Sequence, residues 1–260
     1  MASKDLFKSS PIANVAPFDY PITYGVWNPD EHSKLPIGKK IEEQLLKSLE
    51  ADDAYTILAK GLQVQENGIT LGELDFIIKD HISDTIFHLE LVHKFYIYDH
   101  SQGEDELSRW TGPNYRDKLT FKLDKLERHQ FPLLHRESTL PYLKALNLDP
   151  SKIEQRLCFK AELYIDRTKE RPGSHAHLQA YETGYYYRFE ELESQLPDEA
   201  KYYVCEKRDW IKDESTCTQW FNKSQCIEGL QTHESDGRSK MVWFNQNNRS
   251  GRLLVLFNQQ

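Results

Sequence analysis

The chain has 260 residues, enough to bury the core of one large domain or two small ones, and a composition of 38% hydrophobic and 28% charged residues is that of a folded protein with a polar surface. The formal net charge of −8 argues against a protein that coats nucleic acid through a bulk positive field, but it is compatible with a carboxylate-rich metal pocket. No segment approaches the roughly 20 apolar residues of a membrane helix, and the N-terminus lacks the apolar core of a signal peptide, so we expect a cytoplasmic protein without membrane contact.

The N-terminal segment, residues 1–35, contains several prolines and no hydrophobic period, which predicts an irregular arm that packs on the domain. The first helix is expected directly after Pro36, because Ile41, Leu45 and Leu49 recur at helical spacing. Glu42 lies at the edge of this apolar stripe.

Three strand-like segments follow the first helix, at residues 55–65, 70–80 and 86–98. The first two are separated by Asn67-Gly68, a sequence typical of a tight hairpin turn. These segments predict consecutive antiparallel strands.

Alternation along these strands places the polar side chains on defined faces. In residues 70–80, Asp75 lies on the face opposite Phe76, and in residues 86–98, Glu90 and Lys94 share one face. A charge in the middle of an apolar strand is costly unless it is paired or bound to a metal ion. Asp75, Glu90 and Lys94 are therefore the candidate functional residues.

A second amphipathic helix is expected over residues 114–134, where Pro113 and Asn114 fit a helix start. Its apolar stripe consists of Leu119, Leu123 and Leu126. A further strand is expected over residues 156–167. The predicted order is αβββαβ, and the short aromatic segments of the last hundred residues indicate more strands without a legible topology.

Two carboxylates on neighbouring strands suit phosphodiester hydrolysis. Hard Mg²⁺ prefers a few carboxylate oxygens and retained water molecules. Asp75 and Glu90 supply two carboxylates, and the ammonium group of Lys94 could meet the attacking water or the phosphate. This pattern predicts a site for Mg²⁺ or Mn²⁺.

Several segments resemble known families. LGELDF and HLELVHKFY resemble the Asp strand and the Glu/Lys strand of PD-(D/E)xK nucleases. More narrowly, residues 30–215 resemble the family called domain of unknown function 1853, through IGKKIEEQ, LGELDF, ELVHKFY, GPNYRDKL, ERHQ, HLQAY and EKRDWI. The resemblance implies a restriction-endonuclease-like αβββαβ core with a mixed sheet over residues 36–170, and a strand-rich C-terminal extension over residues 171–260 packed on that core.

The resemblance also implies roles for individual residues. Asp75, Glu90 and the carbonyl group of Leu91 would be metal ligands, Lys94 the catalytic lysine, and Glu42 a first-helix carboxylate that touches the site. The superfamily usually separates Glu and Lys by two positions, whereas the gap here is four, which moves Lys94 roughly 7 Å along the strand. The implied function is a Mg²⁺-dependent nuclease. The alternative is an inactive nuclease-fold protein that binds nucleic acid or a protein partner.

Basic residues of the second helix suggest where a substrate would bind. Lys118, Lys122 and Arg116 are candidate phosphate contacts, with Lys125 and His129 on the same side of the helix. A solvated helix face explains the same pattern. The expected partner is nucleic acid, with DNA favoured over RNA.

Two further interpretations remain open. Cys205, Cys217 and Cys226 could join His175 and His177 in a zinc site, although their irregular spacing argues against it. A metal-free adaptor with an aromatic C-terminal interface is the third interpretation of function.

Overall fold

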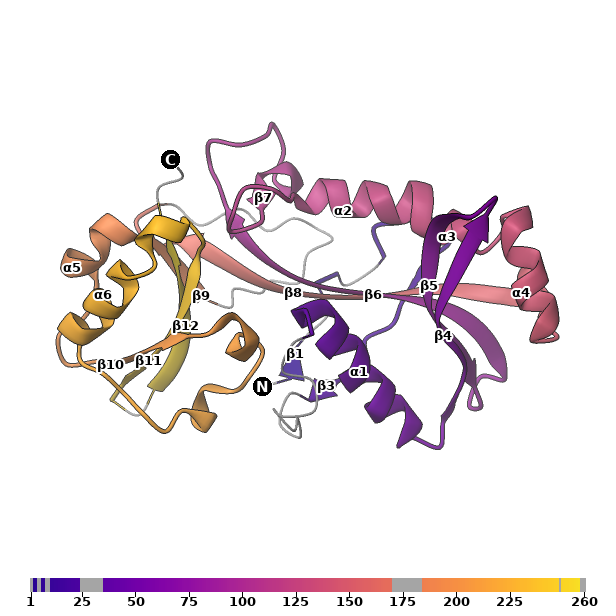
Figure 1. The fold of residues 1–260 in the computed structure, drawn as a ribbon, viewed down its shortest axis with the longest axis horizontal. Helices are drawn as coiled ribbons and strands as arrows, with labels where there is room; N and C mark the ends of the chain where they lie inside the picture. Colours follow the sequence, from indigo (N-terminus) through magenta and orange to yellow (C-terminus); the bar gives the residue numbers. More distant parts are fainter. Residues whose placement is uncertain are drawn as a thin grey trace.

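One large mixed sheet organises the protein. The structure is a computed structural model that describes residues 2–3, 6–7, 10–23, 35–169, 184–247 and 249–257. Eight of the described strands follow one another across the sheet in the order β10-β11-β12-β9-β8-β6-β5-β4 (Figure 1). These strands are β4 Tyr55–Glu66, β5 Ile69–Asp80, β6 Thr85–Tyr98, β8 Ile153–Asp166, β9 Gly184–Arg188, β10 Lys201–Cys205, β11 Lys240–Gln246 and β12 Arg249–Leu256.

Short strands and helices complete the described fold. The short strands are β1 Ala2–Ser3, β2 Ala16–Pro17, β3 Ile22–Thr23 and β7 Trp110–Thr111. The α-helices are α1 Ile37–Glu50, α2 Leu119–Lys125, α3 Phe131–Leu133, α4 Leu140–Ala145, α5 Leu192–Gln195 and α6 Lys223–Gln231. None of the helices in the described part of the chain is long and apolar enough to cross a membrane.

The first half contains the predicted series of a helix, three strands, a helix and a strand, as α1, β4, β5, β6, α2 and β8. β4, β5 and β6 are antiparallel neighbours, as predicted. The predicted turn at Asn67 and Gly68 joins β4 to β5, and both residues have positive φ angles. The helical connection after β6 returns the chain so that β8 runs parallel to β6. The sheet is therefore mixed, as expected.

Helices cover both faces of the first half of the sheet. Ile41 and Leu45 of α1 pack on one face against Phe76 and Leu89. Leu126 and its neighbours after β6 pack on the other face. Each fully buried leucine contributes roughly 1.5–3 kcal/mol relative to an exposed one. The packing fixes α1 and α2 on opposite sides of β6 and β8.

The second helix begins later than predicted and contains a π turn, but it ends at Leu133, close to the predicted end. It begins at Leu119 and not at Pro113, because residues 112–117 form a turn closed by the Gly112 N–H and the Asp117 carbonyl at 2.8 Å. Within that turn Tyr115 has a φ of 58°, which is incompatible with an α-helix. After Lys125 the helix widens into a π turn, Leu126–Gln130, before α3. Its leucine stripe nevertheless packs on the sheet as predicted.

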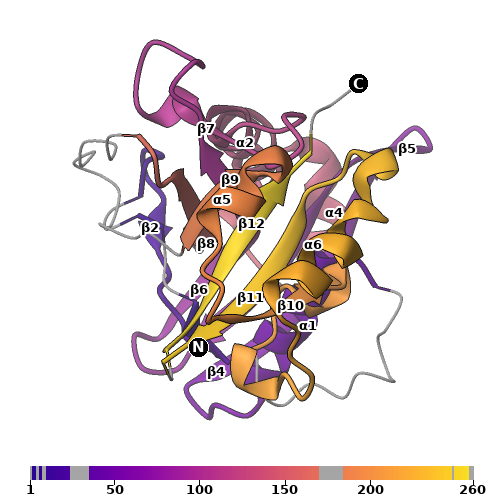
Figure 2. The same cartoon turned by 90° about the vertical axis from the view of Figure 1, so that its left-hand side faces the viewer.

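The C-terminal strands extend the same sheet, which the sequence did not reveal. β9 is parallel to β8 and to β12, and β10 and β11 follow as antiparallel neighbours. α5 and α6 lie over one face of these strands (Figure 2). Tyr187, Tyr202 and Trp243 are buried in this region. Among the described residues the large exposed hydrophobic side chains lie between Leu35 and Leu146, so the structure gives no support to an aromatic C-terminal interface.

The N-terminal arm packs along β8. The backbone N–H of Phe18 donates to the Leu157 carbonyl at 2.9 Å, and the N–H of Leu6 donates to the Phe159 carbonyl at 2.7 Å. The arm thereby covers the part of β8 that β9 does not reach.

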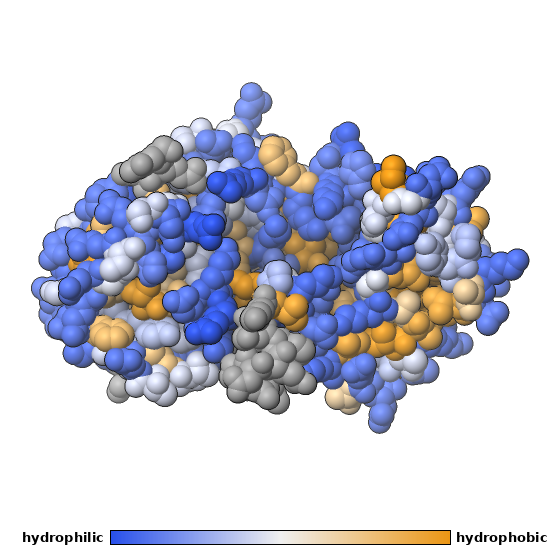
Figure 3. All heavy atoms as spheres, in the orientation of Figure 1, coloured by the Kyte–Doolittle hydropathy of each residue, from blue (hydrophilic) through white to orange (hydrophobic). Residues whose placement is uncertain are grey.

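The face of the molecule in Figure 3 is mostly hydrophilic, with apolar side chains gathered in a few patches.

Candidate active site

Asp75 and Glu90 lie where two neighbouring strands separate. The ladder between β5 and β6 runs from Asp80 and Thr85 to Phe76 and Leu89 and ends there. Beyond this point β5 continues along β4, and β6 continues along β8. Asp75 and Glu90 are the next residue on each strand. Both predicted carboxylates therefore come to one place on adjacent antiparallel strands.

The side chain of Asp75 replaces the missing ladder contact. Its Oδ2 atom accepts a hydrogen bond of 2.9 Å from the backbone N–H of Leu91. The N–H and C=O groups of one residue in a strand point to the same edge, so the Leu91 carbonyl is also directed toward β5. This arrangement brings the three predicted metal ligands together.

Burial and like charge act on Asp75 in the same direction. Burial is the larger cause and the charge of Glu90 the next, and together they raise the pKa of Asp75 to about 8. The carboxylate of Glu42 raises this pKa further, whereas the Leu91 N–H and the charge of Lys122 lower it. Neighbouring carboxylates such as Asp75 and Glu90 repel each other unless a cation lies between them or a proton is shared.

Glu90 is held by two side chains that the sequence did not single out. It is fully buried, and its Oε1 lies 2.9 Å from Nε2 of His88. Its Oε2 accepts a hydrogen bond of 2.5 Å from Nε2 of Gln130. His88 packs edge-on against Phe131, which fixes its ring. Each Glu90 oxygen accepts one hydrogen bond, so each keeps a lone pair available.

The two candidate lysines have different partners. Lys94 projects from the predicted face of β6, and its ammonium group lies 2.5 Å from the carboxylate of Asp117. Lys122 donates to Oε1 of Gln130 at 2.8 Å. Burial lowers the pKa of Lys122, and the charges of Glu90 and Asp75 oppose that effect. Lys122 therefore interacts with the two carboxylates. Lys94 is paired instead with Asp117, which lies in the turn before α2.

Glu42 lies at the edge of this cluster. Its carboxylate contacts Lys39 at 2.7 Å, and the same ammonium group contacts Glu73 at 2.9 Å. Burial is the main cause of the raised pKa of Glu42. Glu42 therefore influences Asp75 through its charge, while its carboxylate pairs with Lys39.

The other candidate phosphate contacts lie at the start of α2 and in the turn before it. Lys118 precedes the helix and donates to the side chain of Gln102 at 3.2 Å. Arg116 is exposed within the turn. Asn114 accepts a hydrogen bond from the backbone N–H of Ser239. Because α2 begins at Leu119, Asn114 and Arg116 lie in the turn before the helix and not in its first turn.

The zinc interpretation receives no support from the described cysteines. Cys205 and Cys226 are buried in clusters on opposite faces of the C-terminal sheet. His175 and His177 lie outside the described residues, as does the HLQAY segment. Within the described ranges, no three or more His, Cys, Asp and Glu side chains are grouped to hold a metal ion.

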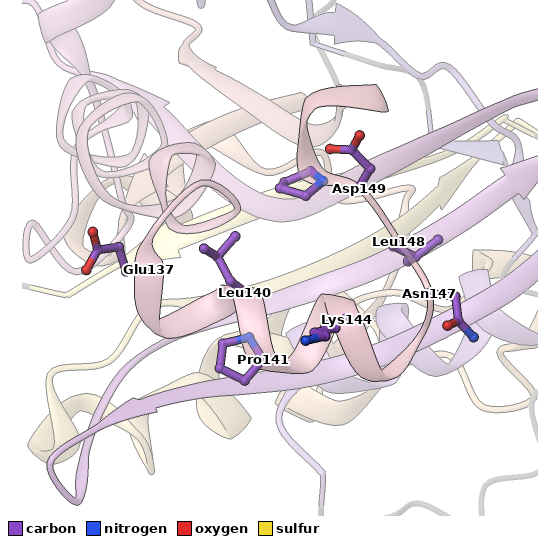
Figure 4. A pocket seen from close by; sticks show the side chains of 8 residues that line it. Glu137, Leu140, Pro141, Lys144, Asn147, Leu148 and Asp149 are labelled. Atoms are coloured by element: carbon purple, nitrogen blue, oxygen red, sulfur yellow. The ribbon is translucent and has the colours of Figure 1, made fainter.

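Two hollows in the described surface lie away from the carboxylates. A shallow depression surrounds α4, lined by residues such as Leu140, Lys144 and Asp149 (Figure 4). A smaller cavity of about 140 Å³ lies in the C-terminal region between Tyr185 and Phe244. Neither hollow shares a residue with the cluster around Asp75 and Glu90.

Comparison with known proteins identifies the family. The family model described as "Domain of unknown function (DUF1853)" matches residues 28–254. The match covers most of the chain, so the protein belongs to this family. No curated protein and no solved structure matches the chain. The chemistry of the site therefore has to be argued from its residues.

Proposed function

We propose that this protein is a Mg²⁺- or Mn²⁺-dependent nuclease with a PD-(D/E)xK-type site on a restriction-endonuclease-like core. The observation that carries the proposal is the meeting of Asp75 and Glu90 at the end of the β5-β6 ladder, one of them with a raised pKa and the other fully buried. The antiparallel β4-β5-β6 series with β8 parallel to β6 supports the proposed core.

The donor set fits Mg²⁺. This ion is commonly bound through one or two carboxylates and keeps several water ligands. Asp75, Glu90 and the Leu91 carbonyl would supply three oxygens, and the free lone pairs of Glu90 allow it to bind a cation while His88 and Gln130 orient it. A cation there would also relieve the repulsion between the two carboxylates.

The reaction would be hydrolysis of a phosphodiester. Bound Mg²⁺ supplies charge neutralisation at the phosphate and lowers the pKa of a water molecule. A water oxygen forms a bond to phosphorus as the bond from phosphorus to one sugar oxygen breaks, and the water loses a proton while the leaving oxygen gains one. The protein's part is to hold Asp75 and Glu90 in fixed positions through the Leu91 N–H, His88 and Gln130.

Nucleic acid is the proposed partner, with DNA favoured over RNA. The net charge of −8 requires that contacts to phosphate be local. One observation favours the second candidate, an inactive nuclease-fold protein that binds nucleic acid or a protein: Lys94 is paired with Asp117. That pair would keep the lysine of the superfamily pattern from the reaction.

The test is metal-dependent cleavage of labelled duplex DNA, single-stranded DNA and RNA. We expect cleavage with Mg²⁺ or Mn²⁺, and a loss of more than roughly 100-fold in Asp75→Asn and in Glu90→Gln. Asp84→Asn is the matched control, since this carboxylate is exposed near the start of β6. Full activity in both site variants would refute the proposal. Thermal stabilisation by Mg²⁺ without any cleavage would favour the inactive alternative.

A further inference from the structure

One ammonium group acts on both carboxylates of the site, and it comes from α2. Lys122 donates to Oε1 of Gln130 at 2.8 Å, and Nε2 of the same amide donates to Oε2 of Glu90 at 2.5 Å. The charges of Glu90 and Asp75 both act on Lys122, and the charge of Lys122 acts in turn on Asp75. A single amide thus links the lysine to the proposed metal ligand.

Lys94, the lysine of the superfamily pattern, is neutralised elsewhere. Its ammonium group and the carboxylate of Asp117 lie 2.5 Å apart, with side chains 38% and 35% exposed. The partner belongs to the turn before α2. The charge of Lys94 is therefore balanced by a carboxylate outside the Asp75 and Glu90 pair.

The π turn explains how Lys122 and Gln130 meet. Residues eight apart on a regular α-helix are offset by about 80° around its axis. The wide turn Leu126–Gln130 accommodates one extra residue, so the two side chains align as residues seven apart would, with an offset of about 20°. Such single π turns are frequent at functional sites.

We infer that Lys122, and not Lys94, supplies the positive charge at the scissile phosphate, and that Gln130 is the residue that positions it. This inference rests on the proposed nuclease function. The ammonium group stabilises the negative charge that develops on the phosphate oxygens and transfers no proton in the proposed step. If the lysine comes from α2, the Glu-Lys gap of four in β6 is explained. The usual gap of two places the strand lysine at the phosphate, and Lys94 does not need that position when Lys122 supplies the charge.

The experiment compares Lys122→Met with Lys94→Met, and uses Lys144→Met on α4 as an exposed control. The first measurement is the single-turnover cleavage rate of a DNA duplex with Mg²⁺. We expect a loss of roughly 100-fold for Lys122→Met and less than about threefold for Lys94→Met. Gln130→Leu should lower kcat roughly tenfold with KM nearly unchanged, because it removes the amide that links the ammonium group of Lys122 to Glu90 without removing either charge.

The second measurement is the affinity for Mn²⁺ alone, by calorimetry. Loss of a nearby like charge should tighten Mn²⁺ binding about threefold in Lys122→Met, whereas Lys122→Arg should keep the affinity of the wild type. This readout does not depend on cleavage and separates a charge in the site from a merely structural lysine. Circular dichroism at the assay temperature verifies that each variant is folded.

The outcomes distinguish the inference from the proposed function. Loss of cleavage in Lys94→Met with near-normal cleavage in Lys122→Met overturns the inference and leaves the nuclease proposal standing. Unchanged Mn²⁺ affinity in folded Lys122→Met also overturns it. A wild-type protein that neither binds Mn²⁺ nor cleaves any substrate refutes the proposed function, and the inference with it.

Discussion

Two clusters among the described residues each hold a pair of carboxylates, and they balance the charge in different ways. In the C-terminal half, Arg252 contacts Glu214 and donates to Glu162 at 3.0 Å. Its guanidinium group also donates to the carbonyl groups of Trp210 and Lys212. At the candidate site, Asp75 and Glu90 have no such central guanidinium among their described contacts, and Gln130 and Lys122 lie to one side.

The difference separates a structural cluster from a functional one. Burial raises the pKa of both Glu162 and Asp75, but the next cause is opposite in sign. The charge of Arg252 opposes burial at Glu162, whereas the charge of Glu90 adds to burial at Asp75. A protein that leaves a carboxylate pair under-neutralised has a site whose energy improves when a cation arrives.

The largest effect is expected when the C-terminal balance is broken. Arg252→Met leaves Glu162 and Glu214 buried without their cation, and should lower the free energy of unfolding by about 3–5 kcal/mol. Urea denaturation at pH 7 measures this change. Arg249→Met is the control, because Arg249 is exposed on the same strand and should have an effect within about 0.5 kcal/mol. A decrease of less than about 1 kcal/mol in the free energy of unfolding of Arg252→Met would contradict a structural role for this cluster.

The next effect concerns pH. The pKa of Asp75 rises from 3.8 to about 8, so between these values the folded protein retains a proton that the unfolded chain has released. The contribution of Asp75 to stability is therefore complete below pH 4 and is lost as the pH rises toward 8, by on the order of 3 kcal/mol between pH 5 and pH 7 alone. Mg²⁺ should reduce this loss, because it stabilises the charged form.

Urea denaturation between pH 5 and pH 8 checks the pH prediction. The wild-type protein should lose stability with rising pH relative to Asp75→Asn, and the two curves should converge when Mg²⁺ is added. Asp84→Asn should follow the wild type, because its carboxylate is exposed. Parallel curves for wild type and Asp75→Asn would show that Asp75 is not under-neutralised.

The smallest effect is expected at Glu42. Its carboxylate pairs with Lys39, so Glu42 should act on the site only through its electrostatic field. Glu42→Gln should then change Mg²⁺ affinity by less than about threefold, since the ammonium group of Lys39 already balances the charge of Glu42. Calorimetric titration measures the affinity. A tenfold loss would make Glu42 a direct ligand and enlarge the donor set.

The sequence predicted those parts of the site that depend on local periodicity. Alternation along a strand has a period of two. Once residues 70–80 and 86–98 are predicted to be neighbouring antiparallel strands, Asp75 and Glu90 are expected to lie close together. The Asn67-Gly68 turn was predictable for the same reason, because its backbone requirement is local.

Contacts between distant segments could not be predicted in this way. Gln130 and Glu90 are separated by 40 residues, and Arg252 and Glu162 by 90. The π turn that aligns Lys122 with Gln130 departs from the helical period on which a sequence pattern relies. The parallel pairing of β9 with β12 likewise depends on a long-range connection that no local signal specifies.

The most direct test of the central claim is the position of a bound ion. A crystal of the wild-type protein grown or soaked with Mn²⁺ would give an anomalous signal at the ion, and a crystal of Asp75→Asn treated in the same way is the control. The account predicts one peak in contact with the carboxylates of Asp75 and Glu90, which is absent from the variant. A wild-type crystal with no peak between these residues, or with Mn²⁺ bound only elsewhere, would contradict the assignment of this site as a metal centre.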